Sequence, residues 1–170
     1  MSQAVLNSLP VGPAGMISRD KASATVDSAL LLSGSAPTAY GTPLVRDSST
    51  GKFRAATSGD TDISGFLALV YPSVAALSDT VDTQSAPTAG FVPNMRRGWM
   101  VVTCNNFAVN APAPGGQVYV RIASASSGKP LNGIEAAADG SNTLAIPGCY
   151  FEGAYDPATG NVEISFHVGH

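Results

Sequence analysis

Arg96-Arg97-Gly98-Trp99-Met100-Val101-Val102 is followed, after a polar break, by Pro112-Ala113-Pro114-Gly115-Gly116-Gln117-Val118-Tyr119-Val120-Arg121-Ile122. Each stretch contains an apolar-rich run of about the length of a strand, and Asn, Pro and Gly residues separate the two runs. This pattern predicts two β-strands joined by a loop.

Strand patterns recur at short spacing in the rest of the chain. Residues 42–47 and 50–56 flank the turn-forming sequence Asp47–Gly51, which predicts a hairpin. The run from 63 to 70 is nearly all apolar, as in a strand that is covered on both faces. Apolar and polar residues alternate from 162 to 168, which predicts a strand at the end of the chain.

Helix patterns are nearly absent. Only residues 134–138 could form a short helical turn, and Gly133 and Gly140 bound them. Many short strands separated by turn residues predict an all-β protein, either a compact β-sandwich or a barrel. Within this class we expect a jelly-roll-like topology.

Two segments lack a strand pattern. Residues 1–23 contain prolines and glycines and show neither a helical nor a strand period, so we expect an extended N-terminal arm. Residues 71–95 are rich in Ala, Ser, Thr, Asp and Pro, which predicts a long loop. The chain is therefore expected to consist of an arm (1–23) and a single β-domain (24–170).

The composition limits the classes of partner. Only 12% of the 170 residues are charged, about half of the roughly 25% that is usual. Low surface charge suits a protein packed against others, although a neutral secreted domain is an alternative. The net charge of -3, with nine Lys and Arg residues in all, argues against a nucleic-acid partner. No run approaches the roughly 18 apolar residues of a membrane span, so we expect no membrane partner.

Candidate chemical sites are few. Asp60–Gly65 begins like a calcium loop, but Tyr71 stands where the loop requires a bidentate Glu. His167 and His170, the only histidines, form no metal-like spacing with the two cysteines. We therefore predict that the protein is not an enzyme and has no catalytic residues, no metal, no cofactor and no small-molecule substrate.

Cys104 and Cys149 are the only cysteines, and each lies in a strand-like segment. They could form a disulfide. For a protein made in a reducing cytosol, two buried free thiols are the favoured interpretation.

Trp99, the only tryptophan, follows Arg96 and Arg97 closely. Aromatic residues and Arg dominate the energetics of binding surfaces, so this group could contact a partner. An ordinary core tryptophan at the start of a strand is the other interpretation, and the sequence leaves both open.

Short motifs along most of the chain resemble those of one protein family. They are Ala14-Gly15-Met16-Ile17, Thr50-Gly51-Lys52-Phe53, Ser64-Gly65-Phe66-Leu67-Ala68-Leu69, Arg96-Arg97-Gly98-Trp99, Gly116-Gln117-Val118-Tyr119-Val120 and Ala145-Ile146-Pro147-Gly148. In these motifs the chain is similar to the capsid decoration, or structural cement, proteins of tailed bacteriophages.

The resemblance implies a non-enzymatic virion protein that is made in the host cytoplasm and binds the outer surface of the capsid. Its partner would be the major capsid protein, and it would stabilise the shell by bridging neighbouring capsid subunits. Low charge and exposed strand edges also predict a homo-oligomer, a trimer or a dimer. The residues expected at the partner interface are Pro10, Val11, Pro13, Met16, Ile17, Arg96, Arg97 and Trp99.

Two other classes of function remain open at this stage. A receptor- or glycan-binding module of a phage head or tail fibre could share this composition, and it would expose an aromatic platform. A lyase or hydrolase carried in a virion would need converging carboxylates or a histidine pair, whereas the polar residues here are scattered.

Overall fold

The computed structural model describes residues 12–19, 23–69 and 85–167, and within these ranges the fold is all-β. The strands are β1 (Thr25–Leu30), β2 (Pro43–Arg46), β3 (Phe53–Ala55), β4 (Gly65–Leu67), β5 (Phe91–Thr103), β6 (Gln117–Arg121), β7 (Ile134–Glu135), β8 (Thr143–Phe151) and β9 (Asn161–His167). A turn of 3-10 helix, η3 (Gly140–Asn142), precedes β8. The described ranges contain no helix long and apolar enough to cross a membrane.

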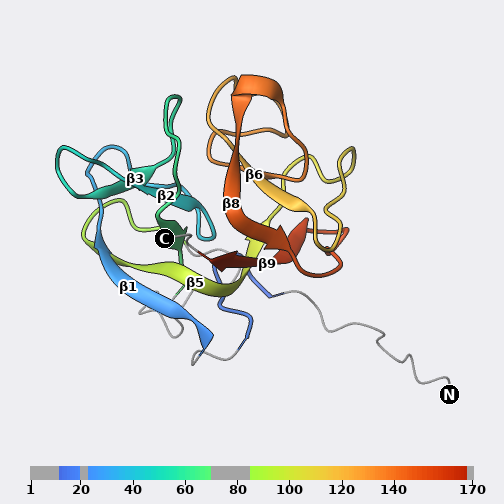
Figure 1. Cartoon of the computed structure of the whole chain (residues 1–170), viewed down its shortest axis with the longest axis horizontal. Helices are drawn as coiled ribbons and strands as arrows, with labels where there is room; N and C mark the ends of the chain where they lie inside the picture. The colour runs from blue at the N-terminus through green and yellow to red at the C-terminus, as the bar shows by residue number, and fades with distance from the viewer. Residues whose placement is uncertain (1–11, 20–22, 70–84, 168–170) are drawn as a thin grey trace, which may run out of the picture.

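The named strands pair antiparallel and form one curled sheet. The strand order is β3-β2-β4-β5-β9-β8-β6-β7, and β1 pairs with β5 beside this path. In Figure 1, β2 and β3 lie on one side of the molecule and β6 and β8 on the other, with β5 and β9 between them. The sheet is thus a half-barrel, and its order does not confirm the expected jelly-roll topology.

The 13-residue strand β5 connects the two halves of the sheet. Its first part pairs with β1 and β4, and its second part pairs with β9. Thr25 lies opposite Arg97, but Val26 lies opposite Met95. Arg96 is therefore an extra residue in β5, which is the definition of a β-bulge.

The bulge changes which residues of β5 face the core. Met95 before the bulge and Met100 after it belong to the same hydrophobic cluster, although an unbroken strand would direct them to opposite faces. Gly98 follows the bulge with a φ of 133°, and a Cβ atom there would lie 2.8 Å from the Cβ of Ala24. A side chain is therefore disfavoured at this position both by the backbone angle and by the lack of space.

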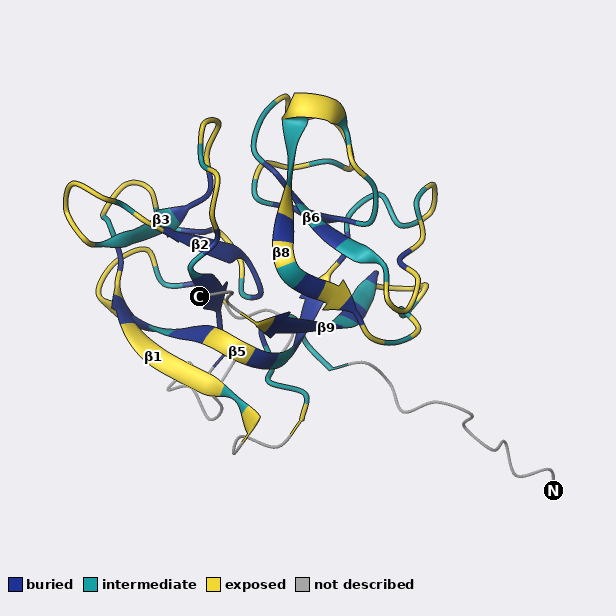
Figure 2. Ribbon diagram, viewed as in Figure 1, coloured by how far each residue is buried: buried dark blue, intermediate teal, exposed yellow. Residues whose placement is uncertain are grey.

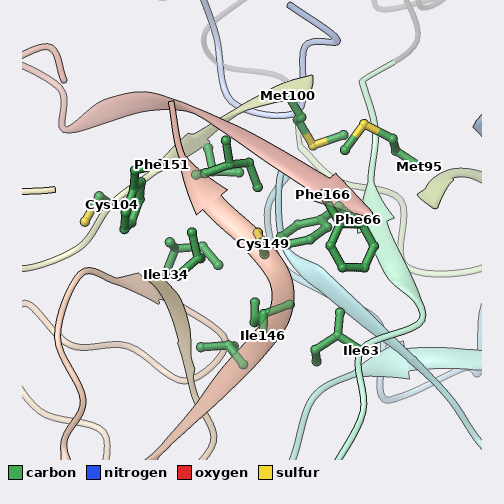
Figure 3. Packing of buried hydrophobic residues seen from close by; sticks show 14 of the residues in the cluster. Ile63, Phe66, Met95, Met100, Cys104, Ile134, Ile146, Cys149, Phe151 and Phe166 are labelled. Atoms are coloured by element: carbon green, nitrogen blue, oxygen red, sulfur yellow. The ribbon is translucent and has the colours of Figure 1, made fainter. Parts of the chain in front are cut away.

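Two hydrophobic clusters lie against the sheet. The larger cluster combines residues of both halves, and Phe66 and Phe166 meet edge to face there with ring centroids 5.0 Å apart. Figure 3 shows both rings beside Cys149 in this cluster. The smaller cluster consists of Ala29, Leu31, Leu44, Leu67, Ala86 and Val92. Since the adjacent residues Phe66 and Leu67 belong to different clusters, β4 is covered on both faces, as its apolar run predicts.

A buried ion cluster supports the β6–β7 pair. The Arg121 side chain is 1% exposed, and its guanidinium donates to the carboxylate of Glu135, which is buried as well. Nη2 of Arg121 also donates to Oδ2 of Asp139 at 2.7 Å, and Nη1 donates to the carbonyls of Ala123 and Ser124. The hydrogen bonds to Glu135 and Asp139 raise the pKa of Arg121 despite its burial.

The possible helical turn at 134–138 is not formed. Ile134 and Glu135 make the short strand β7 instead, because pairing with β6 brings Glu135 to Arg121. The predicted hairpin around Asp47–Gly51 is confirmed by the pairing of β2 with β3. The strand predicted at the end of the chain is confirmed as β9.

The loop expected at about 71–95 ends earlier than predicted, because β5 begins at Phe91. Pro93 obscures this start in the sequence, since a proline lacks the N–H that a central strand normally needs. In β5 the carbonyl of Pro93 still accepts a hydrogen bond from the N–H of Ala68, at 3.0 Å.

Candidate functional site

The neighbouring strands β5, β9 and β8 share one face that is directed away from the larger cluster. Trp99 of β5 lies opposite Ser165 of β9, and Ser165 lies opposite Tyr150 of β8. Directly opposed residues lie on the same side of a sheet, so the two aromatic side chains flank the small Ser165. We call this side the outer face; it includes Arg97, Trp99, Tyr150, Glu163, Ser165 and His167.

Residues 12–19, which we call the N-terminal segment, line the edge of β5 that β9 leaves free. The N–H of Gly15 donates to the carbonyl of Val101 at 2.7 Å, and the N–H of Ser18 donates to the carbonyl of Trp99 at 3.1 Å. Both of these β5 residues also lie opposite residues of β9. The second part of β5 is therefore enclosed by chain on both edges.

Glu163 fixes the N-terminal segment to β9. Its carboxylate accepts from Oγ of Ser18 at 2.6 Å and from Nη2 of Arg19 at 2.7 Å, and Glu152 lies 3.8 Å from the same guanidinium. Burial alone would raise the pKa of Glu163, but the hydrogen bonds from Arg19 and Ser18 outweigh it and lower the pKa. The carboxylate is thus held in its charged form.

Trp99 is the centre of the outer face. Its half-buried ring lies between the guanidinium of Arg19, 4.8 Å from the ring centroid, and the ring of His167, which meets it edge to face at 5.9 Å. The first contact is a cation–π interaction. Tyr150 is 44% exposed on the same face, so aromatic and charged groups adjoin on it, as they do in many binding surfaces.

The structure brings together some of the residues expected at the interface. Pro13, Met16 and Ile17 lie in the N-terminal segment, and Ile17 forms an antiparallel bridge with Met100, next to Trp99. Pro10 and Val11 lie outside the described residues.

The two arginines that precede Gly98 have different neighbours. Arg97 lies opposite His167 and is exposed on the outer face. Arg96, the extra residue of the bulge, lies 3.4 Å from the carboxylate of Asp27 in β1. The bulge therefore directs both side chains to the side of β5 that faces away from the larger cluster, whereas an unbroken strand would direct them to opposite sides.

Sequence reasoning did not identify Arg19, Tyr150 or Glu163 as part of a site. The alternating pattern of the last strand did place Glu163 and His167 on its polar side, and that signal was available. Arg19 lies in a stretch without periodicity, and Tyr150 joins the site only through the pairing of β8 with β9. No sequence pattern specifies that pairing.

Two kinds of reactive group can be assessed in the described residues: metal ligands and thiols. No group of three or more His, Cys, Asp and Glu side chains among them could hold a metal ion. Cys104 and Cys149 are buried free thiols, and burial, together with the charge of Glu135, raises the pKa of Cys104 to about 12. Burial also raises the pKa of Cys149 well above its ordinary value. Both thiols are therefore poor nucleophiles.

A hollow of about 690 Å³ lies between the N-terminal segment and the loops that precede β2, β7 and β9. Its one carboxylate, that of Asp156, accepts from the N–H of Ala158 and the hydroxyl of Thr159, and these hydrogen bonds lower its pKa. A carboxylate that is committed to its own turn is not set up as a general base. The outer face is the stronger candidate, and its chemistry suits binding.

Comparisons with known proteins agree with this geometry. The family model described as "Structural cement protein (E217 gp24/Pam3 gp6)" matches residues 1–167. A chain of the solved structure "The capsid of Myoviridae Phage XM1" is similar in fold, with a TM-score of 0.65 and 17% identity over 98% of this chain and 97% of that chain. No curated protein sequence matches.

Proposed function

We propose that this chain, which belongs to the phage structural cement protein family, binds the outer surface of a capsid and bridges neighbouring capsid subunits. Membership of this family means that the protein is a structural component of the virion, associates with capsid proteins and stabilises the capsid. The exterior position, the major capsid protein as direct partner and the bridging belong to the proposal. So do synthesis in the host cytoplasm and the lack of enzymatic activity.

Bridging gives a physical route to stabilisation. Packaged DNA presses outward on a thin shell, and a protein attached to two subunits adds contacts that must be lost before the shell ruptures. Ligands that bind only the intact state stabilise it by mass action, and simultaneous attachment at several points strengthens the effect.

The observation that supports a binding role most directly is the outer face of β5, β9 and β8. It joins Trp99 and Tyr150 with charged groups whose positions are fixed by hydrogen bonds and ring contacts. A preorganised surface loses little conformational entropy on binding. We infer that this face contacts the major capsid protein.

Attachment to protein-free particles tests this role. Trp99→Ala and Tyr150→Ala should each weaken attachment by about 1 to 4 kcal/mol, because aromatic anchors dominate binding surfaces. Val109→Ala, which alters an exposed apolar residue outside the outer face, is the matched control and should bind normally. Normal attachment of both aromatic variants, in proteins that melt like the wild type, would contradict the assignment of this face.

Residues 1–23 are proposed to serve as a capsid-docking arm. The hydrogen bonds from Gly15 and Ser18 to β5 would anchor it, and the 11 residues before Gly12 could reach about 35 Å if extended. Such an arm can add a strand to a neighbour's sheet through main-chain hydrogen bonds. Removal of residues 2–11 should weaken attachment and leave the melting temperature unchanged, since the anchoring bonds remain.

A glycan-binding module of a head or tail fibre is the alternative function. The exposed ring of Tyr150 on the outer face favours it, since sugars stack on aromatic rings. Arg19 already lies over the ring of Trp99, so a sugar would have to displace it there. Binding of the free protein to host surface glycans, lost in Tyr150→Ala, would favour this alternative.

A further inference from the structure

The hollow beside the N-terminal segment continues the outer face. Thr103 of β5 lies opposite Asn161 of β9, and both residues line the hollow. Asn161 lies two residues before Glu163, so it is on the same side of β9 as the outer face. Gly12 lines the hollow as well, and its carbonyl accepts from Nδ2 of Asn161 at 3.1 Å. A partner bound to the outer face is therefore placed to enter the hollow.

The turn that precedes β9 closely matches the turn between β2 and β3. Both have the sequence Asp-x-x-Thr-Gly, and the carboxylates of Asp47 and Asp156 each accept from a backbone N–H and the threonine hydroxyl of their own turn. The N–H groups of Gly51 and Gly160 donate to the carbonyls of these aspartates at 2.8 and 2.7 Å. Figure 2 shows the turn between β2 and β3 as largely exposed, and residues 157–159 of the other turn are exposed too. Each turn can therefore serve as a reference for the other.

The charges of the two aspartates are balanced differently. Nε of Arg54 lies 3.8 Å from Oδ2 of Asp47. Asp156 makes no ion pair with any described residue, and its hydrogen bonds lower its pKa, so it stays charged at neutral pH. The described residues that line the hollow include no other charged side chain. The hollow therefore carries a negative charge that the described part of the chain does not balance.

The remainder of the lining suits the stem of a basic side chain. Leu69, Pro130 and Leu131 supply apolar surface, and Tyr40 supplies an aromatic ring. Lys and Arg pack their apolar stems along such surface while the charged head stays at polar groups, and aromatic rings attract cations. The volume of about 690 Å³ lies within the roughly 300 to 1,000 Å³ of pockets that enclose ligands. Charge and lining therefore favour a Lys or Arg side chain over an anionic or wholly apolar group.

We propose that the hollow receives a lysine or arginine side chain of the major capsid protein, with its charged group at Asp156. This inference rests on the proposed function, which brings that protein to the outer face. It adds one charged contact to the aromatic contacts of that face. Such a contact fixes the position of the cement protein on its subunit, because complementary charges confer specificity more than affinity.

Neutralising each aspartate in turn tests this contact. Asp156→Asn and Asp47→Asn change the net charge equally and in similar turns, but only Asp156 lines the hollow. We expect Asp156→Asn to weaken attachment to protein-free particles roughly three- to tenfold, with a smaller difference at high salt, because salt screens ion pairs. Asp47→Asn should attach like the wild type. Normal attachment of Asp156→Asn, or equal losses in the two variants, would overturn the inference.

Photo-cross-linking identifies what occupies the hollow. Leu131→Cys places a thiol in its lining and leaves Asp156 intact, while the native Cys104 and Cys149 are fully buried. With a short photoactivated maleimide on this thiol, particles should give a product with the major capsid protein. We expect roughly tenfold more of it than from Val109→Cys, an exposed control outside the lining, because a bound partner has a high effective concentration. A product of two cement chains, or none, would overturn the inference.

Co-sedimentation of the wild-type protein with particles separates this inference from the proposed function. If the wild type does not sediment, the proposed function fails, and the inference that rests on it fails too. If the wild type sediments but Asp156→Asn attaches equally well, only the inference about the hollow is overturned.

Discussion

Glu163 connects the last strand to the N-terminal segment. It binds Arg19, which lies 144 positions earlier in the sequence. The hydrogen bonds of Arg19 and Ser18 lower its pKa below the ordinary value of 4.5, against the opposing effect of burial. A carboxyl group with a lowered pKa in the folded state adds stability above its unfolded pKa and loses it as the pH falls through the folded pKa. The attachment of the segment should therefore weaken in acid.

The single tryptophan reports this change, because Arg19 lies over its ring. We expect the fluorescence of Trp99 to show a transition below about pH 4.5, where carboxyl groups of this kind protonate. Glu163→Gln should abolish it, whereas His167→Ala, which removes the other ring contact of Trp99, should retain it. Identical acid transitions in the wild type and Glu163→Gln would refute the role of this carboxylate.

Arg121 and Glu135 form a buried ion pair, so their energetic effects are coupled. Arg121→Met leaves the Glu135 carboxylate buried without its partner and should lower the free energy of unfolding by about 3 to 5 kcal/mol. Replacing both residues, in Arg121→Met with Glu135→Leu, should recover most of this loss. Urea denaturation measures both variants. A double variant no more stable than Arg121→Met would show that the two side chains act independently.

Among the described residues, β1 pairs with β5 alone, so its other edge has no partner strand there. Pro93, opposite Ser28, has no N–H, and its carbonyl accepts from Ala68 on the β4 side. The two residues are therefore a pair without mutual hydrogen bonds, and the N–H of Ser28 points away from β5. The N–H of the next residue, Ala29, points the other way, toward its partner Val92 in β5.

This alternation predicts opposite effects of proline at adjacent positions. Ser28→Pro removes an N–H that has no partner in the described sheet and should cost less than about 1 kcal/mol, whereas Ala29→Pro breaks a ladder bond and should cost about 3 kcal/mol or more. Thermal unfolding of the two variants makes the comparison. Equal losses would mean that the edge of β1 is not open as described.

Short sequence patterns predicted the strands and turns whose geometry depends on neighbouring residues only. The strict alternation of 162–168 predicted β9, and the turn residues of Asp47–Gly51 predicted the β2–β3 hairpin, because side-chain period and turn angles depend on neighbouring residues only. Residues 134–138 have the composition of a helical turn, but the partner that makes part of them a strand, Arg121, lies elsewhere in the chain.

The candidate site was harder to predict because it depends on register. Trp99 and Tyr150 share a face since each lies opposite Ser165, and no short motif specifies this pairing. The extra residue of the bulge, Arg96, also reverses the faces along β5, so a strand pattern read straight through 91–103 assigns half of its side chains to the wrong side.

At the scale of the whole molecule, the curled sheet presents two different surfaces. The outer face offers aromatic and charged groups, while the opposite side exposes the apolar residues Val26, Leu30 and Phe91 where β1 and β5 begin to pair. A protein that ties a shell together needs more than one contact surface, because a single contact only decorates it. The arrangement of β5, with a bulge between the two surfaces, supplies both from one strand.

The resistance of the loaded capsid to rupture tests the stabilising role most directly. Particles with and without the bound protein would be heated or subjected to osmotic shock while the release of DNA is followed. We expect release at a higher temperature, and more slowly after shock, when the protein is bound, because its contacts must be lost before the shell opens. Equal release curves, with the protein confirmed on one set of particles, would contradict a cementing role.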